Sequence, residues 1–274
     1  MQAIYIPIQS LHPFTGHPYK VQDNDEMNRL IESIQEQGVM TPLIVRPIEG
    51  SATEYEVISG HRRLRAAQKA GLKEVPAFIH AVDRDEAAIQ LVDSNLHREH
   101  LRPSEKAFAY KLKMEALNHP GRTSGQVGQK WSREYVSETE SGRQVQRYIR
   151  LTHLLPGLLD LLDEGRIAFT VGVELSYLTI EEQRVVLDTS ALYDCTPSYS
   201  QACRMHRESE AGGVRNRIEA ILSEEKPNQR EKVSFQYADL KKYFPSSYTP
   251  KQISDAILRL VEADYRRRRD RDAR

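Results

Sequence analysis

The sequence predicts an α+β domain, then an all-α domain, then a small helical C-terminal segment. Short β-rich runs alternate with helical patterns over the first hundred or so residues, whereas helical patterns alone follow them. A turn-rich stretch at 118–128 and a charged stretch at 208–231, which contains two adjacent glycines and a proline, separate these parts. We therefore expect domains at residues 1–117, 118–222 and 223–274.

The first domain should contain both helices and strands. Apolar residues recur at helical spacing from Asp25 to Gln37, and Gly38 follows as a C-terminal stop. A helix rich in arginine begins after Gly60 and ends at Gly71. Runs of β-prone residues bounded by turn residues predict strands at Leu43–Pro47, Tyr55–Ser59 and Val75–Ile79. Two more helices are expected at about Asp85–Leu96 and Pro103–Leu117, the second opened by its proline.

Composition excludes some classes of protein. The 39 basic and 39 acidic residues balance, so a surface for a polyanion has to be a local patch. The first residues lack the pattern of a signal peptide, and no apolar run is long enough to span a membrane, which predicts a cytoplasmic protein. Cys195 and Cys203 form Cys-x7-Cys-x2-His with His206, but a fourth ligand is missing nearby, so no metal site is expected.

The segment from Val57 to Ala67 predicts an anion site. A strand stops at Gly60, and the N–H groups at the start of the next helix favour negative charge. Arg62, Arg63 and Arg65 follow directly, and guanidinium groups suit phosphate because they donate two hydrogen bonds at once. The alternative is an ordinary solvated helix start.

Three segments together resemble the ParB/Spo0J/Noc family of partition proteins. They are Gly38-Val-Met-Thr-Pro, Gly60-His-Arg-Arg-Leu-Arg-Ala and Asp93-Ser-Asn-Leu-His-Arg-Glu-His-Leu-Arg-Pro, in the family's order and spacing. The resemblance covers roughly residues 5–180. It implies an N-terminal ParB/sulfiredoxin-like domain that binds CTP, followed by a helix-turn-helix domain that binds double-stranded DNA at a specific site.

The same resemblance implies which residues hold the nucleotide. Gly60, His61, Arg62 and Arg63 would cradle a triphosphate carrying Mg²⁺. Asn95 and Arg98 would close the pocket, and the base would lie beside Thr41 and Pro42. Lys20 stands near the place where the family has an arginine, and it could take over that phosphate contact.

Two departures from the family pattern leave CTP hydrolysis open. The family commonly has glutamate where this chain has His61 and Ser94. Acidic groups there could hold magnesium or orient water, so their loss predicts slow turnover. Asp93 could compensate, although a shift of one residue on a helix turns the side chain by about 100°.

The second domain should read DNA. We expect a first helix at Ser132–Thr139 and a second at Arg143–Leu151, with Val145 facing inward. Arginine and glutamine side chains recognise guanine and adenine in the major groove, although a charged face can also be merely solvated. The predicted DNA-binding residues are Arg143, Gln144, Gln146, Arg147 and Arg150.

The C-terminal segment carries an amphipathic helix, predicted at Pro250–Tyr265, and a tail at 266–274 with six arginines against two aspartates. Its apolar stripe either packs within the chain or forms a homodimer, as the family resemblance implies. The tail could contact DNA phosphates without sequence preference.

The resulting hypothesis is a CTP-responsive DNA-binding protein for partition of a chromosome, plasmid or mobile element, located at the nucleoid, with a possible ParA-like ATPase partner. One alternative is a transcriptional repressor or regulator with a non-switching N-terminal domain. A ParB-like phosphotransferase or nuclease is disfavoured, because His61 and Ser94 replace carboxylates. Sulfiredoxin chemistry is excluded, since Gly60 stands where that enzyme has its catalytic cysteine.

Overall fold

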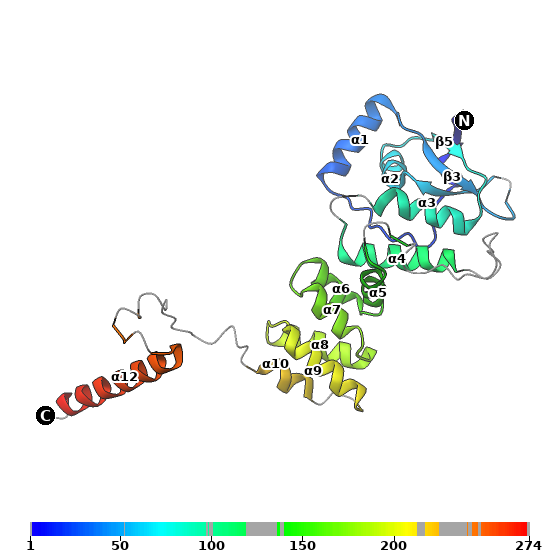
Figure 1. Ribbon diagram of the computed structural model, residues 1–274. Coiled ribbons are helices and arrows are strands. Elements are labelled where there is room, and N and C mark those ends of the chain that lie inside the picture. Colours follow the sequence, from blue (N-terminus) through cyan, green and yellow to red (C-terminus); the bar gives the residue numbers. More distant parts are fainter. Residues whose placement is uncertain are drawn as a thin grey trace. The chain divides into compact units, whose positions relative to one another are not determined.

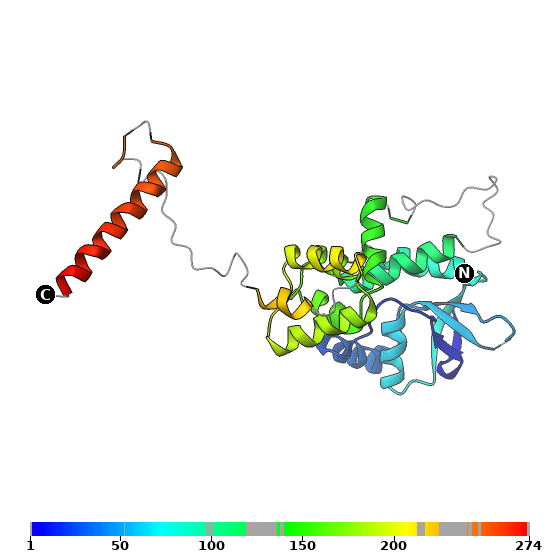
Figure 2. The ribbon, with the colours of Figure 1, turned by 90° about the horizontal axis from the view of Figure 1, so that it is seen from below.

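The computed structural model describes residues 2–51, 53–96, 98, 101–118, 136–137, 140–212, 217–224, 240, 243–245 and 248–272. The chain divides into two compact units, Met1–Glu224 and Glu225–Arg274 (Figure 1). Within the first unit the strands, in blue and cyan, gather at one side, and the green and yellow helices gather at the other (Figure 2).

A five-stranded sheet in the order β1-β5-β3-β4-β2 organises the N-terminal part. Strand β3 pairs antiparallel with β4 and parallel with β5. Strands β3 and β4 confirm the predicted bounds, whereas the outer strands β1 and β2 and the short 3-10 helix between them were not predicted. The elements are β1 (Ile4–Pro7), η1 (Ile8–Ser10), β2 (Leu11–Pro13), β3 (Leu43–Pro47), β4 (Tyr55–Ser59) and β5 (Glu74–Ile79).

Helices cover both faces of this sheet. They are α1 (Asp25–Gln37), α2 (His61–Lys69), α3 (Arg84–Leu96) and α4 (Pro103–Leu117). Neighbouring residues of β4 show the alternation, because successive strand side chains point to opposite faces. Val57 packs in the cluster that contains residues of α1 and α2, and Ile58 packs in the cluster that contains residues of α3 and α4. The end of β4 therefore lies between the layer of α1 and α2 and the layer of α3 and α4.

The remaining helices of the first unit form a second core. They are α5 (Gly142–Leu151), α6 (Pro156–Asp163), α7 (Phe169–Leu175), α8 (Ile180–Leu192), α9 (Tyr199–Glu210) and α10 (Ile218–Ser223). Side chains of Ser141, Thr179 and Ser198 cap α5, α8 and α9 by accepting backbone N–H bonds, as the helix start requires. The predicted helix at Ser132–Thr139 lies largely outside the described residues.

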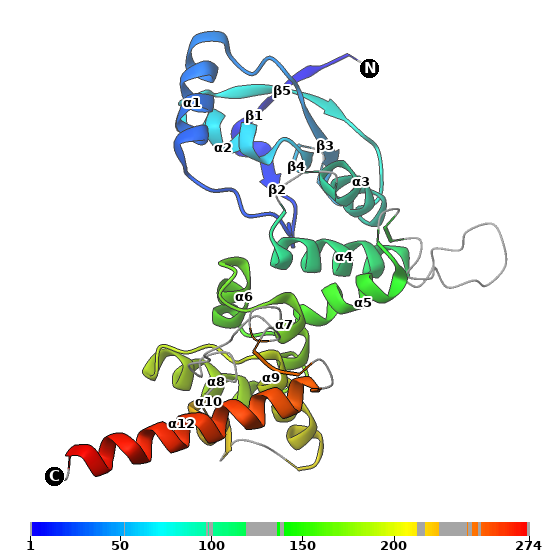
Figure 3. The ribbon, with the colours of Figure 1, turned by 60° about the vertical axis from the view of Figure 1, so that its left-hand side comes forward.

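Helix α4 belongs to both cores, and Figure 3 shows it between the sheet and helices α5 and α6. Ala109 and Ala116 pack with α3, whereas Ala107 and Tyr110 pack with residues of α5 and its neighbours. The predicted boundary after Leu117 therefore follows a helix that contributes to both parts.

The second unit contains α12 (Pro250–Asp272), which extends beyond the predicted end at Tyr265. Ile253 is buried, but Leu260 and Val261 are 65% and 61% exposed. Self-association through this stripe stays a prediction. Among the described residues, no helix has the length and apolar character needed to cross a membrane.

Candidate functional site

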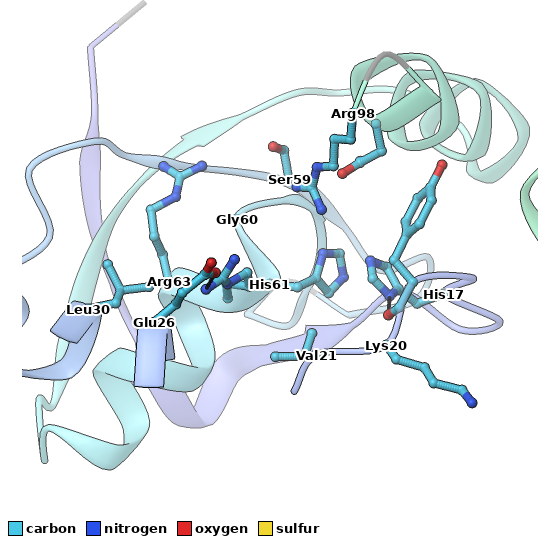
Figure 4. Close-up of a pocket in the computed structure, with 13 residues that line it drawn as sticks. His17, Lys20, Val21, Glu26, Leu30, Ser59, Gly60, His61, Arg63 and Arg98 are labelled. Atoms are coloured by element: carbon cyan, nitrogen blue, oxygen red, sulfur yellow. Dashed lines mark hydrogen bonds and ion pairs between the residues drawn. The ribbon is translucent and has the colours of Figure 1, made fainter. Parts of the chain in front are cut away.

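A cavity of about 420 Å³ opens at the start of α2 (Figure 4). Its wall comes from the loop between β2 and α1, from α1, from the end of β4 and from the residues around the end of α3. Of the residues that the sequence assigned to nucleotide binding, the structure places Gly60, His61, Arg62, Arg63, Asn95 and Arg98 on this wall.

Gly60 shapes the cavity floor. It precedes α2 with a left-handed φ of 105°, a conformation that favours glycine. An added Cβ would lie 3.0 Å from Leu43 Cγ and 3.2 Å from the Arg63 guanidinium carbon. The missing side chain therefore leaves room for both neighbours and lets an anion approach the backbone at the helix start.

Cationic side chains dominate the described part of the wall. The described wall has one carboxylate, Glu26, which accepts a 3.0 Å hydrogen bond from Arg62. Its cationic residues are Lys20, Arg62, Arg63 and Arg98. The Arg98 guanidinium lies 6.0 Å from the ring centroid of Tyr19. This excess of positive charge suits a polyanion.

Thr41 and Pro42 are absent from the described wall. Their backbone carbonyls instead accept bonds from Arg63 Nη1, at 2.5 and 2.7 Å. The two residues thus orient an arginine of the pocket, and their predicted contact with a base remains a prediction.

Two histidines whose rings are in tilted contact also line the cavity. The ring centroids of His17 and His61 lie 3.8 Å apart. The Phe14 N–H donates to His61 Nε2 at 3.3 Å, and the ring nitrogen His17 Nδ1 contacts the Tyr19 carbonyl at 2.7 Å. Burial, together with smaller electrostatic contributions from His17 and Arg98, lowers the pKa of His61 to about 3. His61 is therefore neutral near pH 7.

Sequence reasoning missed His17 as a pocket residue. Burial lowers its pKa as well, against the opposing effect of the Tyr19 carbonyl. The signal was present, because His17 lies in the Gly16-His-Pro-Tyr-Lys segment from which only Lys20 was selected.

The end of α3 contributes Asn95 but not its two predecessors. Asn95 is buried, and its Nδ2 donates to the Leu91 carbonyl at 2.7 Å. Ser94 Oγ also donates to Leu91, and Asp93 pairs with Lys113 at 2.5 Å. Neither Ser94 nor Asp93 is on the described cavity wall, so Asp93 does not occupy the place of a missing pocket glutamate.

The described pocket offers little for a metal ion by itself. Glu26 is the one carboxylate on the described wall, and no group of three or more acidic, histidine or cysteine side chains suited to a metal occurs among the described residues. Magnesium commonly binds one or two carboxylates together with substrate phosphates. The donor set therefore fits Mg²⁺ only when phosphate oxygens supply most of its ligands.

Helix α5 presents the predicted DNA-binding residues. Val145 is buried, and Arg143 is exposed at the start of the helix. Arg147 donates to Gln144 Oε1 at 3.2 Å, and its guanidinium lies 5.0 Å from the Phe169 ring centroid. Gln144, Gln146 and Arg147 are partly exposed. Arg143 and its polar neighbours are thus available to a ligand.

Arg150 is held differently from the other four residues. Its Nη2 donates to the Ser176 carbonyl at 2.8 Å, and its guanidinium lies 4.1 Å from the Tyr177 ring centroid. Tyr177 stacks on His206 with ring centroids 4.2 Å apart. These contacts, which the sequence did not indicate, tie the end of α5 to the helices that follow it.

Comparison with known proteins shows which family the chain resembles. A family model described as the ParB N-terminal domain matches residues 1–96. The chromosome-partitioning protein Spo0J of Thermus thermophilus is 35% identical over 182 residues, which cover 66% of this chain and 61% of that protein. Residues 1–96 thus resemble a ParB N-terminal domain, and the chain is similar to ParB-family partition proteins.

Other ParB-family proteins match over similar stretches. A probable chromosome-partitioning protein ParB of Coxiella burnetii is 34% identical and covers 59% of this chain. The chain spans 61% of the Thermus protein and 51% of the Coxiella protein. The nucleoid occlusion protein of Listeria innocua is 27% identical, with 66% of each chain covered.

Solved structures also align with this chain. Two are C-terminally truncated ParB proteins of Caulobacter crescentus. The one complexed with CTP-gamma-S is 28% identical with a TM-score of 0.33, and it covers 64% of this chain and 91% of that one. The other, complexed to the centromeric parS site, is 23% identical with a TM-score of 0.43, covering 75% and 99%.

Proposed function

We propose that this chain is a CTP-responsive, sequence-specific DNA-binding protein that acts as a homodimer in partition of a chromosome, plasmid or mobile element. The names of its chromosome-partitioning relatives support the process. The cavity at the start of α2 supports the proposal of nucleotide binding, and the exposed polar side chains of α5 support the proposal of DNA binding. A ParA-like ATPase is the partner class that the family resemblance implies.

The observation that carries the proposal is the charge of the cavity. Four cationic residues and one carboxylate line the described wall around the backbone at Gly60, and burial lowers the pKa of both histidines on it. A triphosphate supplies the negative charge that this wall lacks, and helix-start N–H groups accommodate its oxygens. Preference for cytosine over other bases rests on the resemblance to the family.

The DNA step is assigned to α5. Phosphate contacts would position the helix, and exposed side chains such as Arg143, Gln146 and Arg147 would contact base edges. Arg150 would act mainly by fixing the helix, because its guanidinium already contacts Ser176 and Tyr177.

A capture experiment tests this proposal. The full-length protein is mixed with fragmented DNA from its source cells, and the retained fragments are sequenced with CTP, with ATP and without nucleotide. We expect a few enriched sites and a CTP-dependent change in the lifetime of their complexes. Equal enrichment and equal complex lifetimes with CTP, with ATP and without nucleotide would favour the repressor alternative.

Matched variants separate the two steps of that experiment. Arg143→Ala in α5 should abolish enrichment, whereas Arg184→Ala should not, because Arg184 is an exposed arginine of α8 that pairs with Glu181. Equal loss in both variants would contradict the assignment of DNA recognition to α5.

A further inference from the structure

Three successive residues in the first turn of α4 contact three different parts of the first unit. Ser104 donates its N–H and its hydroxyl to Asp163 of α6, at 3.0 and 2.5 Å. Glu105 accepts from the backbone of Lys20, in the loop that lines the cavity. Lys106 pairs with Glu140, next to the cap of α5. This single turn joins the cavity to the proposed DNA-binding helix and to α6.

Glu105 uses both carboxylate oxygens in this junction. Its Oε1 accepts from the Lys20 N–H at 2.9 Å, and its Oε2 accepts from the Arg102 N–H at 3.2 Å. The second bond satisfies the Arg102 N–H at the start of α4, which has no backbone partner within the helix. A movement of the Lys20 backbone would therefore reach the first turn of α4 directly.

The Lys20 side chain links the same loop to α6. Its Nζ lies 3.5 Å from Asp160 Oδ1, and both side chains are more than half exposed. In Figure 4 it extends away from His61 and Arg98. Exposed ion pairs of this kind are weak, so a triphosphate in the cavity would compete effectively for the ammonium group.

We propose that Glu105 is a positioning residue that couples occupancy of the cavity to the helical core. When Lys20 turns toward phosphate, its loop leaves Glu105 and Asp160, and the first turn of α4 loosens its hold on α6. This coupling rests on the proposed function, because it requires a nucleotide in the cavity. The ligand that drives it is CTP with Mg²⁺.

Hydrogen exchange measured by mass spectrometry on the full-length protein tests this role. In the parent, CTP should slow exchange of amides at residues 60–66 and speed exchange at residues 156–164, each by about threefold, since local opening sets these rates. Glu105→Gln should keep the slowing at 60–66 but lose the change at 156–164. Glu115→Gln is the control, because Glu115 is an exposed residue at the other end of α4.

A second variant tests whether the Lys20–Asp160 ion pair, rather than Glu105, carries the coupling. Asp160→Asn removes only the weak ionic contact with Lys20 and leaves Glu105 in place, so CTP should still speed exchange at residues 156–164 of this variant. A thermal melt checks that each variant is folded.

The outcomes are distinct. The coupling is wrong if CTP speeds amide exchange in α6 of Glu105→Gln as much as in the parent. It is wrong as well if CTP slows exchange at residues 60–66 of the parent but leaves exchange in α6 unchanged. It is also wrong if Asp160→Asn abolishes the effect of CTP at residues 156–164, because the Lys20–Asp160 ion pair and not Glu105 would then carry the coupling. If residues 60–66 of the parent do not slow, the nucleotide site itself fails, and the coupling fails with it.

Discussion

The imidazole of His61 lies against that of His17, with ring centroids 3.8 Å apart and planes tilted by 38°. His61 is the first residue of α2, where the positive end of the helix dipole and the charge of Arg98 both disfavour protonation of the imidazole. The bond from Phe14 N–H to His61 Nε2 also requires an unprotonated nitrogen. The pocket is thus built around neutral histidines.

The buried state of His61 predicts an acid-sensitive fold. Its folded pKa of about 3 lies below the unfolded value of 6.5, so the stabilisation is complete above pH 6.5 and is lost as pH falls toward 3. Between pH 7.5 and 5.5 the parent should lose about 1 kcal/mol more unfolding free energy than His61→Gln, which does not titrate. Urea unfolding at both pH values measures this, and equal losses would show that His61 is not held neutral.

Gly60→Ala, directly before α2, should be more damaging than the same change at Gly71, which lies just beyond the other end of that helix. Gly71 also has a positive φ, 77°, but an added Cβ there meets nothing within 4 Å. We expect Gly71→Ala to cost about 1 kcal/mol of stability from backbone strain alone, and Gly60→Ala to cost about 1–3 kcal/mol more from crowding of Leu43 and Arg63. Denaturant melts decide this, and equal costs would refute the close approach.

Arg63→Ala should weaken CTP binding about 10–100-fold, because it removes a charge-assisted contact and releases the Thr41 and Pro42 carbonyls. Arg63→Lys should not restore binding, since lysine lacks the forked geometry. Arg29→Ala, an exposed arginine of α1, is the control. Calorimetric titration gives the affinities, and full rescue by lysine would argue for charge alone.

Replacement of Arg147 should cost about 1–3 kcal/mol at the specific DNA site if it contacts a base edge. Deletion of residues 266–274 should instead weaken binding to all sequences alike and flatten its salt dependence, because arginines there would contact phosphates. Binding measured at two salt concentrations separates these effects. The reverse pattern would reject this division between α5 and the tail.

Hydrolysis of bound CTP should be slow. His61 is neutral, Ser94 is off the described wall, and Asp93 is committed to Lys113 on α4. Asp93→Asn should therefore leave phosphate release unchanged in the presence of Mg²⁺ and DNA. A fall in phosphate release would mean that Asp93 does supply the carboxylate.

Periodicity predicted the elements with strong local signals. Helix α1 has a regular apolar face and begins at the side-chain cap of Asn24, so both ends were visible in the sequence. Strands β1 and β2 were missed because they are short and contain proline, and their pairing partners, β5 and β4, lie far along the chain. Local patterns do not encode such distant pairing.

The same division applies to the site. Contiguous motifs located Gly60 to Arg63 as well as Asn95 and Arg98, which the structure brings to one cavity. The stack of Arg150 on Tyr177 and the contact of Glu105 with Lys20 join residues that lie 27 and 85 positions apart. Only the tertiary fold shows that these side chains make specific contacts and are not simply exposed to solvent on a helix surface.

Calorimetric titration of the full-length protein with CTP, ATP, GTP and UTP, each with Mg²⁺, tests the central claim most directly. We predict saturable binding of CTP at one site per chain, at least about tenfold tighter than any other triphosphate, which corresponds to about 1.4 kcal/mol. Equal and weak binding of all four nucleotides would contradict the claim.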